Sequence, residues 1–365
     1  MTQKLYLRIR PIILFILFIL FGTIHTQANT SELTKIQSDS TLISYLKEFG
    51  IETTSHNELE LLKSGKEKFI DLFQKIETAK HHIHLEYFNF RNDSIANTLF
   101  ELLGKKAQEG VEVRAIFDAF GNASNNQPLK KKHLKAIREK GIEIVQFDPI
   151  RFPWINHVFH RDHRKIVVID GAIGYTGGMN IADYYINGLP EIGEWRDMHV
   201  RIKGEAVAHL QDIFLDMWNK CTKQQISGDA YYPYRTSLIP APSQKNEVAI
   251  VDRYPKKDPK TMRRVYAKAI ESAEQNIQII NPYFTPTRII KKAIKKAARK
   301  GVNVEIMIPG KSDIKFTPDA ALYIANQLRK KGANIYIYNG GFHHSKIMMI
   351  DSTYCTVGST NLNSR

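Results

Sequence analysis

Two short stretches of the chain place histidine, lysine and aspartate at the same spacing. The first reads HRKIVVID and begins at His163, and the second reads HSKIMMID and begins at His344. In each, an asparagine follows the aspartate by ten residues, across a glycine-containing turn. The residues of the two patterns are His163, Lys165, Asp170, His344, Lys346 and Asp351. A His-x-Lys-x4-Asp pattern that occurs twice indicates a paired site, because two matches arise by chance far less easily than one.

These residue types indicate chemistry on a phosphodiester. Residues two apart in a strand share one face, so each histidine is expected to point the same way as the lysine that follows it. Two imidazoles and two ammonium groups in one cleft form a poor metal site, because the lysines repel a cation. They suit an anion, since lysines neutralise phosphoryl oxygens, one imidazole attacks phosphorus and the other protonates the leaving oxygen. The symmetry of the patterns does not say which histidine does which.

The chain around the two motifs is written twice. Residues 57–88 and the segment that begins at Asn246 each read as a strand, an amphipathic helix and a strand that closes on Tyr-Phe. A further helix and a buried type of strand follow in each copy. Strands that alternate with helices in this way predict an α/β fold with two tandem domains and mostly parallel sheets. We expect the first domain at 57–221, a linker at 222–245 and the second domain at 246–365.

Composition adds a weak constraint on the partner. The chain has 365 residues with 52 Lys and Arg against 37 Asp and Glu, which gives a formal charge of +15. Such a balance favours an anionic partner, which could be a nucleic acid, an acidic membrane surface or a phosphate-bearing substrate. Only two cysteines occur, which excludes a disulfide-rich scaffold and a cysteine-based zinc site.

The first residues resemble an export segment. Lys4, Arg8 and Arg10 precede an uninterrupted apolar run at residues 11–24. A run of this length fits the core of a signal peptide better than a membrane span of about 20 residues. We therefore predict a signal peptide or a membrane anchor at 1–28, followed by a linker at 29–56. The rest of the chain is then expected at the membrane, on its extracytoplasmic side.

The duplicated motif resembles that of the phospholipase D superfamily, and the surrounding sequence is similar to its bacterial cardiolipin synthases. The similar stretches include GEWRDMHVRIKGEAV from Gly193, NPYFTP from Asn281, and GSTNLNSR from Gly358. The resemblance extends from about Asn57 to Arg365. It implies two α/β/α sandwich domains related by a pseudo-twofold axis, with the site between them and with no metal or organic cofactor. It also implies condensation of two phosphatidylglycerol molecules into cardiolipin and glycerol.

The resemblance also implies roles for individual residues. His163 would be the nucleophile, and His344 would be the general acid and then the general base. Lys165 and Lys346 would bind phosphate oxygens, and Asp197 would orient the imidazole of His163. Asp170 and Asp351, which belong to the catalytic motif, are expected to act as structural ion-pair partners. The residues expected to assist substrate binding, in and after the two turns, are Gly178, Asn180, Ser359 and Asn361.

The sequence departs from the family at its carboxyl end. It stops 14 residues after Asp351, before the segment in which family members carry a glutamate that orients the second histidine. We therefore expect the second domain to be incomplete, and a chain limited to these residues to be weakly active.

Two other functions remain open. Hydrolysis of a phosphodiester, by a phospholipase D or a nuclease, would use the same groups. The apolar amino end favours phosphatidylglycerol and an anionic membrane surface as partners over nucleic acid. A non-enzymatic anion-binding protein is the third possibility, which the intact His and Lys pairs disfavour.

Overall fold

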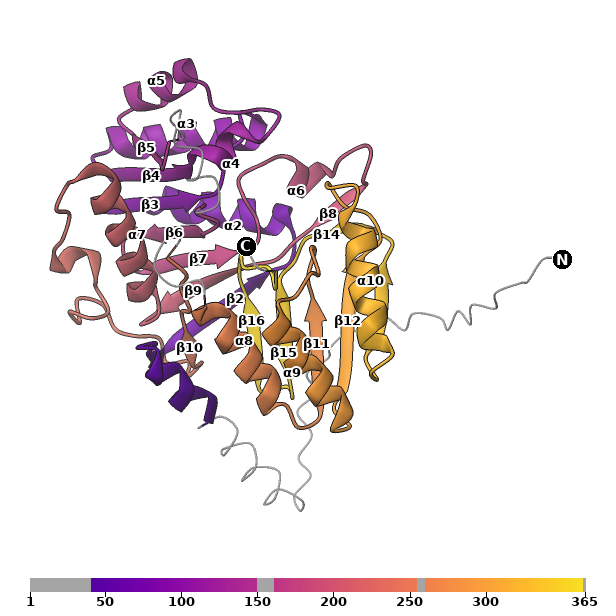
Figure 1. The fold of residues 1–365 in the computed structure, drawn as a ribbon. Helices are drawn as coiled ribbons and strands as arrows, with labels where there is room; N and C mark the ends of the chain where they lie inside the picture. Colours follow the sequence, from indigo (N-terminus) through magenta and orange to yellow (C-terminus); the bar gives the residue numbers. More distant parts are fainter. Residues whose placement is uncertain (1–40, 150–160, 255–259, 364–365) are drawn as a thin grey trace, which may run out of the picture.

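Each half of the chain is built around one β-sheet (Figure 1). The structure is a computed structural model that describes residues 41–149, 161–254 and 260–363. The predicted signal peptide or anchor lies outside the described residues. No helix within the described ranges is both long and apolar enough to cross a bilayer.

The first half follows a short helical segment at 41–48. Its elements are β1 (Thr53–Thr54), β2 (Asn57–Leu62), α2 (Gly65–Glu77), β3 (His82–Tyr87), α3 (Ser94–Gln108), β4 (Glu112–Asp118), α4 (Ala119–Ala123), α5 (Lys131–Glu139), β5 (Glu143–Phe147), β6 (Lys165–Ile169), β7 (Ile173–Gly177), α6 (Tyr184–Asn187), β8 (Glu194–Arg196), β9 (His199–Gly204) and α7 (Val207–Thr222). A single 3-10 turn, η2 (Asp229–Tyr231), lies in the segment expected to be the linker.

The second half repeats the alternation of strands and helices. Its elements are β10 (Val248–Ala249), α8 (Thr261–Ser272), β11 (Asn276–Ile280), α9 (Arg288–Arg299), β12 (Asn303–Pro309), α10 (Thr317–Arg329), β13 (Asn334–Tyr338), β14 (Gly341–His343), β15 (Ile347–Ile350) and β16 (Tyr354–Val357).

The two sheets share one strand order. The first contains the run β7-β6-β3-β4-β5 and is extended by β9 and β2, and the second is β16-β15-β11-β12-β13. In both, the strand that follows the His-x-Lys pair lies beside the first strand of the unit. This arrangement places β6 and β15 inside their sheets, where a strand is buried on both faces or held from both sides.

The expectation of mostly parallel sheets is wrong. Only β3-β4-β5 and β11-β12-β13 are parallel, while β6 and β15 run antiparallel to both of their neighbours. The reason is the length of the connections. Turns of three residues, 170–172 and 351–353, join β6 to β7 and β15 to β16, and so short a connection can only reverse the chain.

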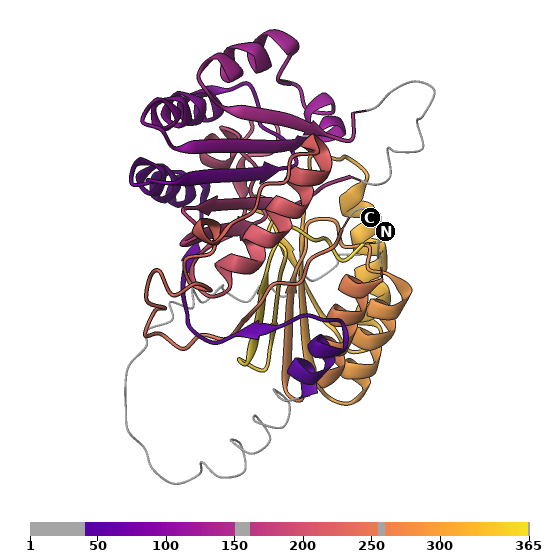
Figure 2. The ribbon, with the colours of Figure 1, turned by 90° about the vertical axis from the view of Figure 1, so that its left-hand side faces the viewer.

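Helices cover the first sheet on both faces. Val167 and Ile169 of β6 pack in one core with α2 and α3, whereas Ile166 and Val168 face α7. The expected α/β/α sandwich therefore holds for this half, as the turned view also shows (Figure 2). Burial on both faces explains why β6 reads as an unbroken apolar run.

The second sheet is covered differently. Residues of α8, α9 and α10 join one core with the alternate residues Ile277 and Ile279 of β11. On the opposite face, Gln278 and Met349 are exposed. Within the described part of the chain, the second half is thus a two-layer unit, and the expected third layer is not present there.

The halves meet through a short ladder. Strand β14 of the second half pairs with β8 of the first, in parallel, at the junction of the two sheets (Figure 1). Gly341 begins this ladder at φ 129°, and a Cβ atom there would lie 2.3 Å from the carbonyl oxygen of Glu194. Only glycine fits at this approach. The ladder leads directly into His344 on one side and Asp197 on the other.

Candidate active site

The first histidine lies just before its strand. His163 precedes Lys165, the first residue of β6, and its ring stacks on Phe88 with centroids 4.2 Å apart. Lys165 is buried, and its Nζ donates to the carbonyl oxygen of His163 at 2.7 Å. The lysine thereby fixes the backbone that carries the exposed imidazole.

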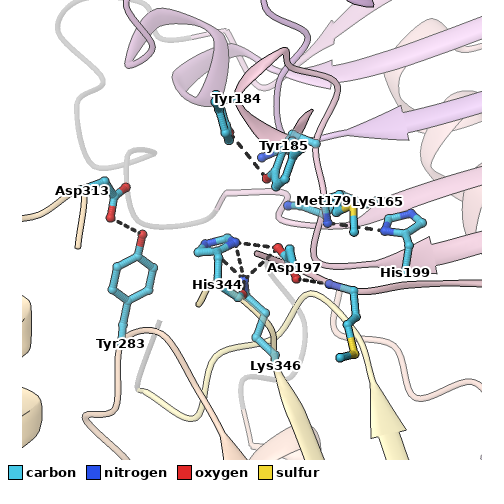
Figure 3. A network of polar contacts seen from close by, with 12 residues as sticks. Lys165, Met179, Tyr184, Tyr185, Asp197, His199, Tyr283, Asp313, His344 and Lys346 are labelled. Carbon is cyan, nitrogen blue, oxygen red and sulfur yellow. Dashed lines mark hydrogen bonds and ion pairs between the residues drawn. The ribbon is translucent and has the colours of Figure 1, made fainter. Parts of the chain in front are cut away.

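The second histidine is held from across the junction. The amide of His344 donates to the carbonyl oxygen of Arg196 at 2.6 Å, which continues the β8–β14 ladder by one residue. Its Nδ1 lies 2.7 Å from Oδ2 of Asp197. Lys346 lies on the same carboxylate, with Nζ 3.7 Å from Oδ2, and also donates to the carbonyl oxygen of His344 (Figure 3).

The prediction that Asp197 orients His163 is therefore wrong. Asp197 belongs to the first half but pairs with the histidine of the second, because β8 carries it across the junction. Sequence proximity to the first motif suggested the opposite pairing. Among the described residues, no carboxylate is hydrogen-bonded to the imidazole of His163.

The carboxylate of Asp197 sits in a tightly shaped place. It is fully buried, and Oδ1 accepts a hydrogen bond from the amide of Met198 at 2.8 Å. A Cβ atom on Gly178 would lie 2.1 Å from that oxygen. The structure thus gives Gly178 a reason that differs from the predicted contact with substrate: it leaves room for Asp197.

The two histidines and the two lysines share one electrostatic environment. Desolvation, and then the charge of Lys346, lower the pKa of Lys165 to about 7. Desolvation lowers the pKa of Lys346 to about 8, against the opposing charge of Asp197. Two ammonium groups whose pKa values fall in this way are short of an anion, which a bound phosphodiester would supply.

The two histidines differ from each other within this environment. Desolvation and the charges of Lys165 and Lys346 lower the pKa of His163, although its side chain stays open to solvent. The ring is therefore neutral at pH 7. Desolvation and Lys346 also lower the pKa of His344, but Asp197 acts against them. Burial opposes ionisation of Asp197, yet the charges of Lys346 and His344 keep its pKa below the ordinary value.

The motif aspartates lie away from the four basic groups, in the turns that end β6 and β15. The carboxylate of Asp170 accepts hydrogen bonds from the amides of Lys80, His81 and His82, at 2.8–3.0 Å. Asp351 accepts in the same way from the amides of residues 274–276. Both are structural, but the expected ion pairs are replaced by hydrogen bonds to backbone amides. Each fixes the start of the strand that lies beside the histidine-bearing strand.

The predicted asparagines are placed near their turns. Asn180 is buried and Asn361 is half-buried, and the side-chain oxygen of each has no hydrogen-bond partner within the described chain. Ser359 is half-buried after β16. A buried amide left without a partner is costly unless something else satisfies it. These two amides are therefore available to a ligand.

Several supporting residues escaped the sequence reading. Lys68 of α2 is fully buried, and its Nζ donates to the carbonyl oxygens of Met179 and Asn180, at 3.1 and 3.0 Å. Desolvation lowers its pKa well below the ordinary value. His199 of β9 lies with Nδ1 3.4 Å from the amide of Met179 (Figure 3). The sequence WRDMH contains His199, but nothing in the pattern around Lys68 distinguishes it from a surface lysine.

A second unpredicted pair approaches His344 from its own half. The ring of Tyr283 lies 5.7 Å from that of His344, edge to face, and its hydroxyl donates to Asp313 at 2.8 Å (Figure 3). Trp195 contacts His344 on another side, at 5.6 Å between ring centroids. Aromatic walls of this kind exclude water from the imidazole. In the described part of the chain, no group of three or more His, Cys, Asp or Glu side chains is arranged to hold a metal ion.

Comparison with known proteins agrees with this geometry. A family model described as cardiolipin synthase, PLD-like domain, matches residues 72–218 and 266–365. The chain belongs to this family of phospholipase D-like proteins. Both matched segments contain one His-x-Lys pair, so the family accounts for the duplicated motif.

Curated members of the family are similar over most of the chain. Cardiolipin synthase 1 of Bacillus cereus is 36% identical over 314 residues, which cover 84% of this chain and 60% of the relative. A cardiolipin synthase of Staphylococcus aureus is 40% identical over 315 residues, which cover 86% of this chain and 62% of the relative. This family member thus spans about 60% of the length of the curated relatives it matches.

Solved structures support the fold alone. Phosphatidylserine synthase of Haemophilus influenzae aligns over 90% of this chain and 83% of its own, with a TM-score of 0.62 and 16% identity. Polyphosphate kinase of Porphyromonas gingivalis aligns over 83% of this chain and 45% of its own, with a TM-score of 0.51 and 12% identity. The phospholipase D-like architecture of this family member is therefore shared with proteins of very different sequence.

Proposed function

We propose that the protein is a phosphatidyltransferase that condenses two phosphatidylglycerol molecules into cardiolipin and glycerol. The observation that carries the proposal is the carboxylate of Asp197, 2.7 Å from Nδ1 of His344, in a site whose two lysines have lowered pKa values. One histidine has an acid–base partner and the other is neutral beside the same lysines. This division of roles suits a two-step displacement at phosphorus.

In the first step, a neutral ring nitrogen of His163 attacks the phosphorus of the donor lipid. The P–N bond forms as the P–O bond to the departing glycerol breaks, and His344 gives its proton to that oxygen. Asp197 stabilises the protonated state of His344 before transfer, because it raises the pKa of that ring. The phosphatidyl group is then held as a phosphohistidine.

In the second step, the groups act in reverse. His344, now neutral, takes the proton from a hydroxyl of the second phosphatidylglycerol. The resulting oxygen attacks phosphorus, the P–N bond breaks, and His163 leaves as the neutral ring. Lys165 and Lys346 neutralise the phosphoryl oxygens in both steps, and the unpartnered amides of Asn180 and Asn361 are placed to assist.

The assignment of the two histidines rests on their different partners. A nucleophile must be unprotonated, which the lowered pKa of His163 favours. A general acid needs a group that supports its charged form, and His344 has Asp197. The sequence left this choice to family resemblance, so the pairing with Asp197 adds an independent physical reason for it.

The full chain incubated with phosphatidylglycerol vesicles, followed by mass spectrometry of the lipids, tests the proposal. Cardiolipin together with glycerol is the expected product pair. Phosphatidic acid would instead identify a phospholipase D, and unchanged lipid would leave an anion-binding protein. Cleavage of a nucleic acid in parallel reactions would identify a nuclease.

Variants then test the two roles. His163→Ala is expected to abolish turnover and to prevent retention of labelled phosphatidyl group on acid-quenched protein. His344→Ala is expected to slow both steps. His133→Ala in α5 is the matched control, since that ring serves only the helix start, where Nδ1 accepts from the amide of Lys130. Full transferase activity in His163→Ala would refute the nucleophile assignment.

We also propose where the reaction takes place. The basic and apolar residues at 1–28 support attachment or export at a membrane, with the catalytic halves on the extracytoplasmic side. Fusing a reporter that is active only outside the cytoplasm to the carboxyl end tests this orientation. An inactive reporter on a stably expressed chain would refute it.

A further inference from the structure

Apolar side chains gather at the start of α10 instead of in the core. Phe316 is 71% exposed and Tyr323 is 69% exposed, and Ile314 and Leu322 are also exposed. Single exposed apolar residues are normal, but four within ten residues form a contiguous feature. We call residues 311–323 the apolar rim.

The rim is built rigidly enough to keep these side chains outward. The amide of Thr317 donates to the carbonyl oxygen of Ile314 at 3.0 Å, and its hydroxyl donates to the same oxygen at 2.7 Å. Thr317 also contacts Ser312, whose hydroxyl donates to Asp313 at 3.0 Å. The turn that carries Phe316 is thus closed by its own hydrogen bonds, and Phe316 does not have to fold back to complete it.

The rim adjoins the active site directly. Asp313 accepts the hydrogen bond of Tyr283, and the ring of Tyr283 lies 5.7 Å from the ring of His344 (Figure 3). One hydrogen bond and one ring contact therefore separate the exposed apolar side chains from the proposed general acid. Whatever surface the rim rests on is brought to the entrance of the site.

Charge distinguishes the kind of surface. Lys311 and Lys315 are exposed and flank the apolar side chains of the rim. The carboxylate between them, Asp313, already accepts two hydrogen bonds. Exposed aromatic and aliphatic groups between lysines match the boundary of an anionic bilayer, where apolar groups enter among the acyl chains and ammonium groups lie at the phosphates.

We propose that the apolar rim docks on the surface of an anionic bilayer, with Phe316 inserted, and so holds the active-site entrance against the membrane that supplies the lipid substrate. The proposal rests on the proposed function for the nature of the substrate. The docking itself follows from the exposure and charge of the rim. It names a surface of the catalytic halves, separate from residues 1–28.

Local depth measurements test the docking without any turnover. Phe316→Trp and Leu238→Trp are made in the full chain, since Leu238 is 65% exposed in the segment at 222–245 and serves as the matched control. Both variants are mixed with phosphatidylglycerol vesicles that contain brominated acyl chains. Quenching beyond that of the parent chain is expected for Phe316→Trp and not for Leu238→Trp. Equal quenching of the two variants would overturn the proposal, even if residues 1–28 tether the protein to the vesicles.

The charge of the rim gives a second readout. Replacing Lys311 and Lys315 with glutamine is expected to reduce the quenching at position 316 in anionic vesicles, with about a fivefold weaker association per lysine. Neutral phosphatidylcholine vesicles should give little quenching in either background. Quenching that is the same in neutral and anionic vesicles would contradict the role of the lysines.

Activity separates this proposal from the proposed function. The ratio of kcat/KM on phosphatidylglycerol vesicles to kcat/KM on dispersed short-chain phosphatidylglycerol should fall about tenfold in Phe316→Ser, through loss of most of the burial of one aromatic ring. The ratio should stay constant in Leu238→Ser. An unchanged ratio in Phe316→Ser refutes the docking, whereas absence of turnover on both substrates in the parent chain refutes the function and leaves the quenching result standing.

Discussion

Replacement of Asp197 by asparagine is the sharpest test of the site. The substitution keeps the volume of the side chain but removes a charge that is fully buried, 2.7 Å from Nδ1 of His344 and 3.7 Å from Nζ of Lys346. Asparagine can still contact the ring but does not favour its protonated form. We therefore expect His344 to lose its proton at lower pH and to become a poor general acid at pH 7.

The size of the effect follows from these distances. Opposite unit charges about 4 Å apart interact by about 4 kcal/mol at the effective dielectric constant that describes protein sites. Part of this is recovered by water and by the remaining dipole of the amide, so we expect a loss of about 3–4 kcal/mol of transition-state stabilisation. That corresponds to a hundred- to thousandfold decrease in kcat.

Two assays check the expectation. Cardiolipin formation on phosphatidylglycerol vesicles gives kcat, and nitrogen-15 NMR of labelled histidine gives the pKa of His344 directly. Asp212→Asn is the control, because Asp212 forms a half-exposed pair with Arg235 outside the site. A folded Asp197→Asn protein that keeps more than a tenth of the activity, or that leaves the pKa of His344 unchanged, would refute the reasoning.

Three further predictions concern shape, pH and the support of His163. Gly178→Ala should abolish activity while the protein still folds, because the added methyl group would lie 2.1 Å from the carboxylate of Asp197; activity and circular dichroism measure the two effects. His82 is buried with its pKa lowered to about 4, mainly by desolvation, so the unfolded chain binds more protons between pH 6.5 and 4; urea unfolding should show stability intact above pH 6.5 and reduced by about 3 kcal/mol at pH 4. Arg164 pairs with Glu86 and with both oxygens of Asp252, and Arg164→Lys should lower the free energy of unfolding by about 1–3 kcal/mol in urea titrations.

Each of these has a control in the same chain. Gly358→Ala should be harmless, because its Cβ atom would meet nothing within 4 Å. His82→Gln should flatten the loss of stability between pH 6.5 and 4. Arg235→Lys removes a comparable two-oxygen pair at the surface, and should cost less than Arg164→Lys. A control that behaves like its partner would count against the stated cause.

The strand order and the four basic groups are the parts that the sequence predicts well. The spacing of His163 and Lys165, repeated at His344 and Lys346, is local information that a pattern carries directly. Strand direction is not local. The sequence reading expected parallel strands throughout, because apolar strands between helices look alike whichever way they run. Only the length of the turns at 170–172 and 351–353 decides the direction.

The partner of each histidine could not be predicted from the sequence. Asp197 lies 34 positions from His163 and 147 from His344, yet it contacts the distant one. The pairing depends on the β8–β14 ladder, which joins two segments that have no sequence pattern in common. Lys68 escaped for a similar reason, since its burial results from the packing of α2 against the turn after β7.

The β8–β14 ladder has a consequence for how such a protein can be divided. The proposed acid–base group is assembled from a ring in one copy of the repeat and a carboxylate in the other, so neither copy owns it. A solitary ancestral unit could have made the same pair only by meeting a second unit, as a dimer. Joining the copies by residues 222–245 turned that encounter into an intramolecular one, at an effective concentration that no longer depends on expression level. Fusion therefore left the two copies free to diverge, with Arg164 and Glu86 in one and Ser345 and Ile280 at the corresponding positions of the other.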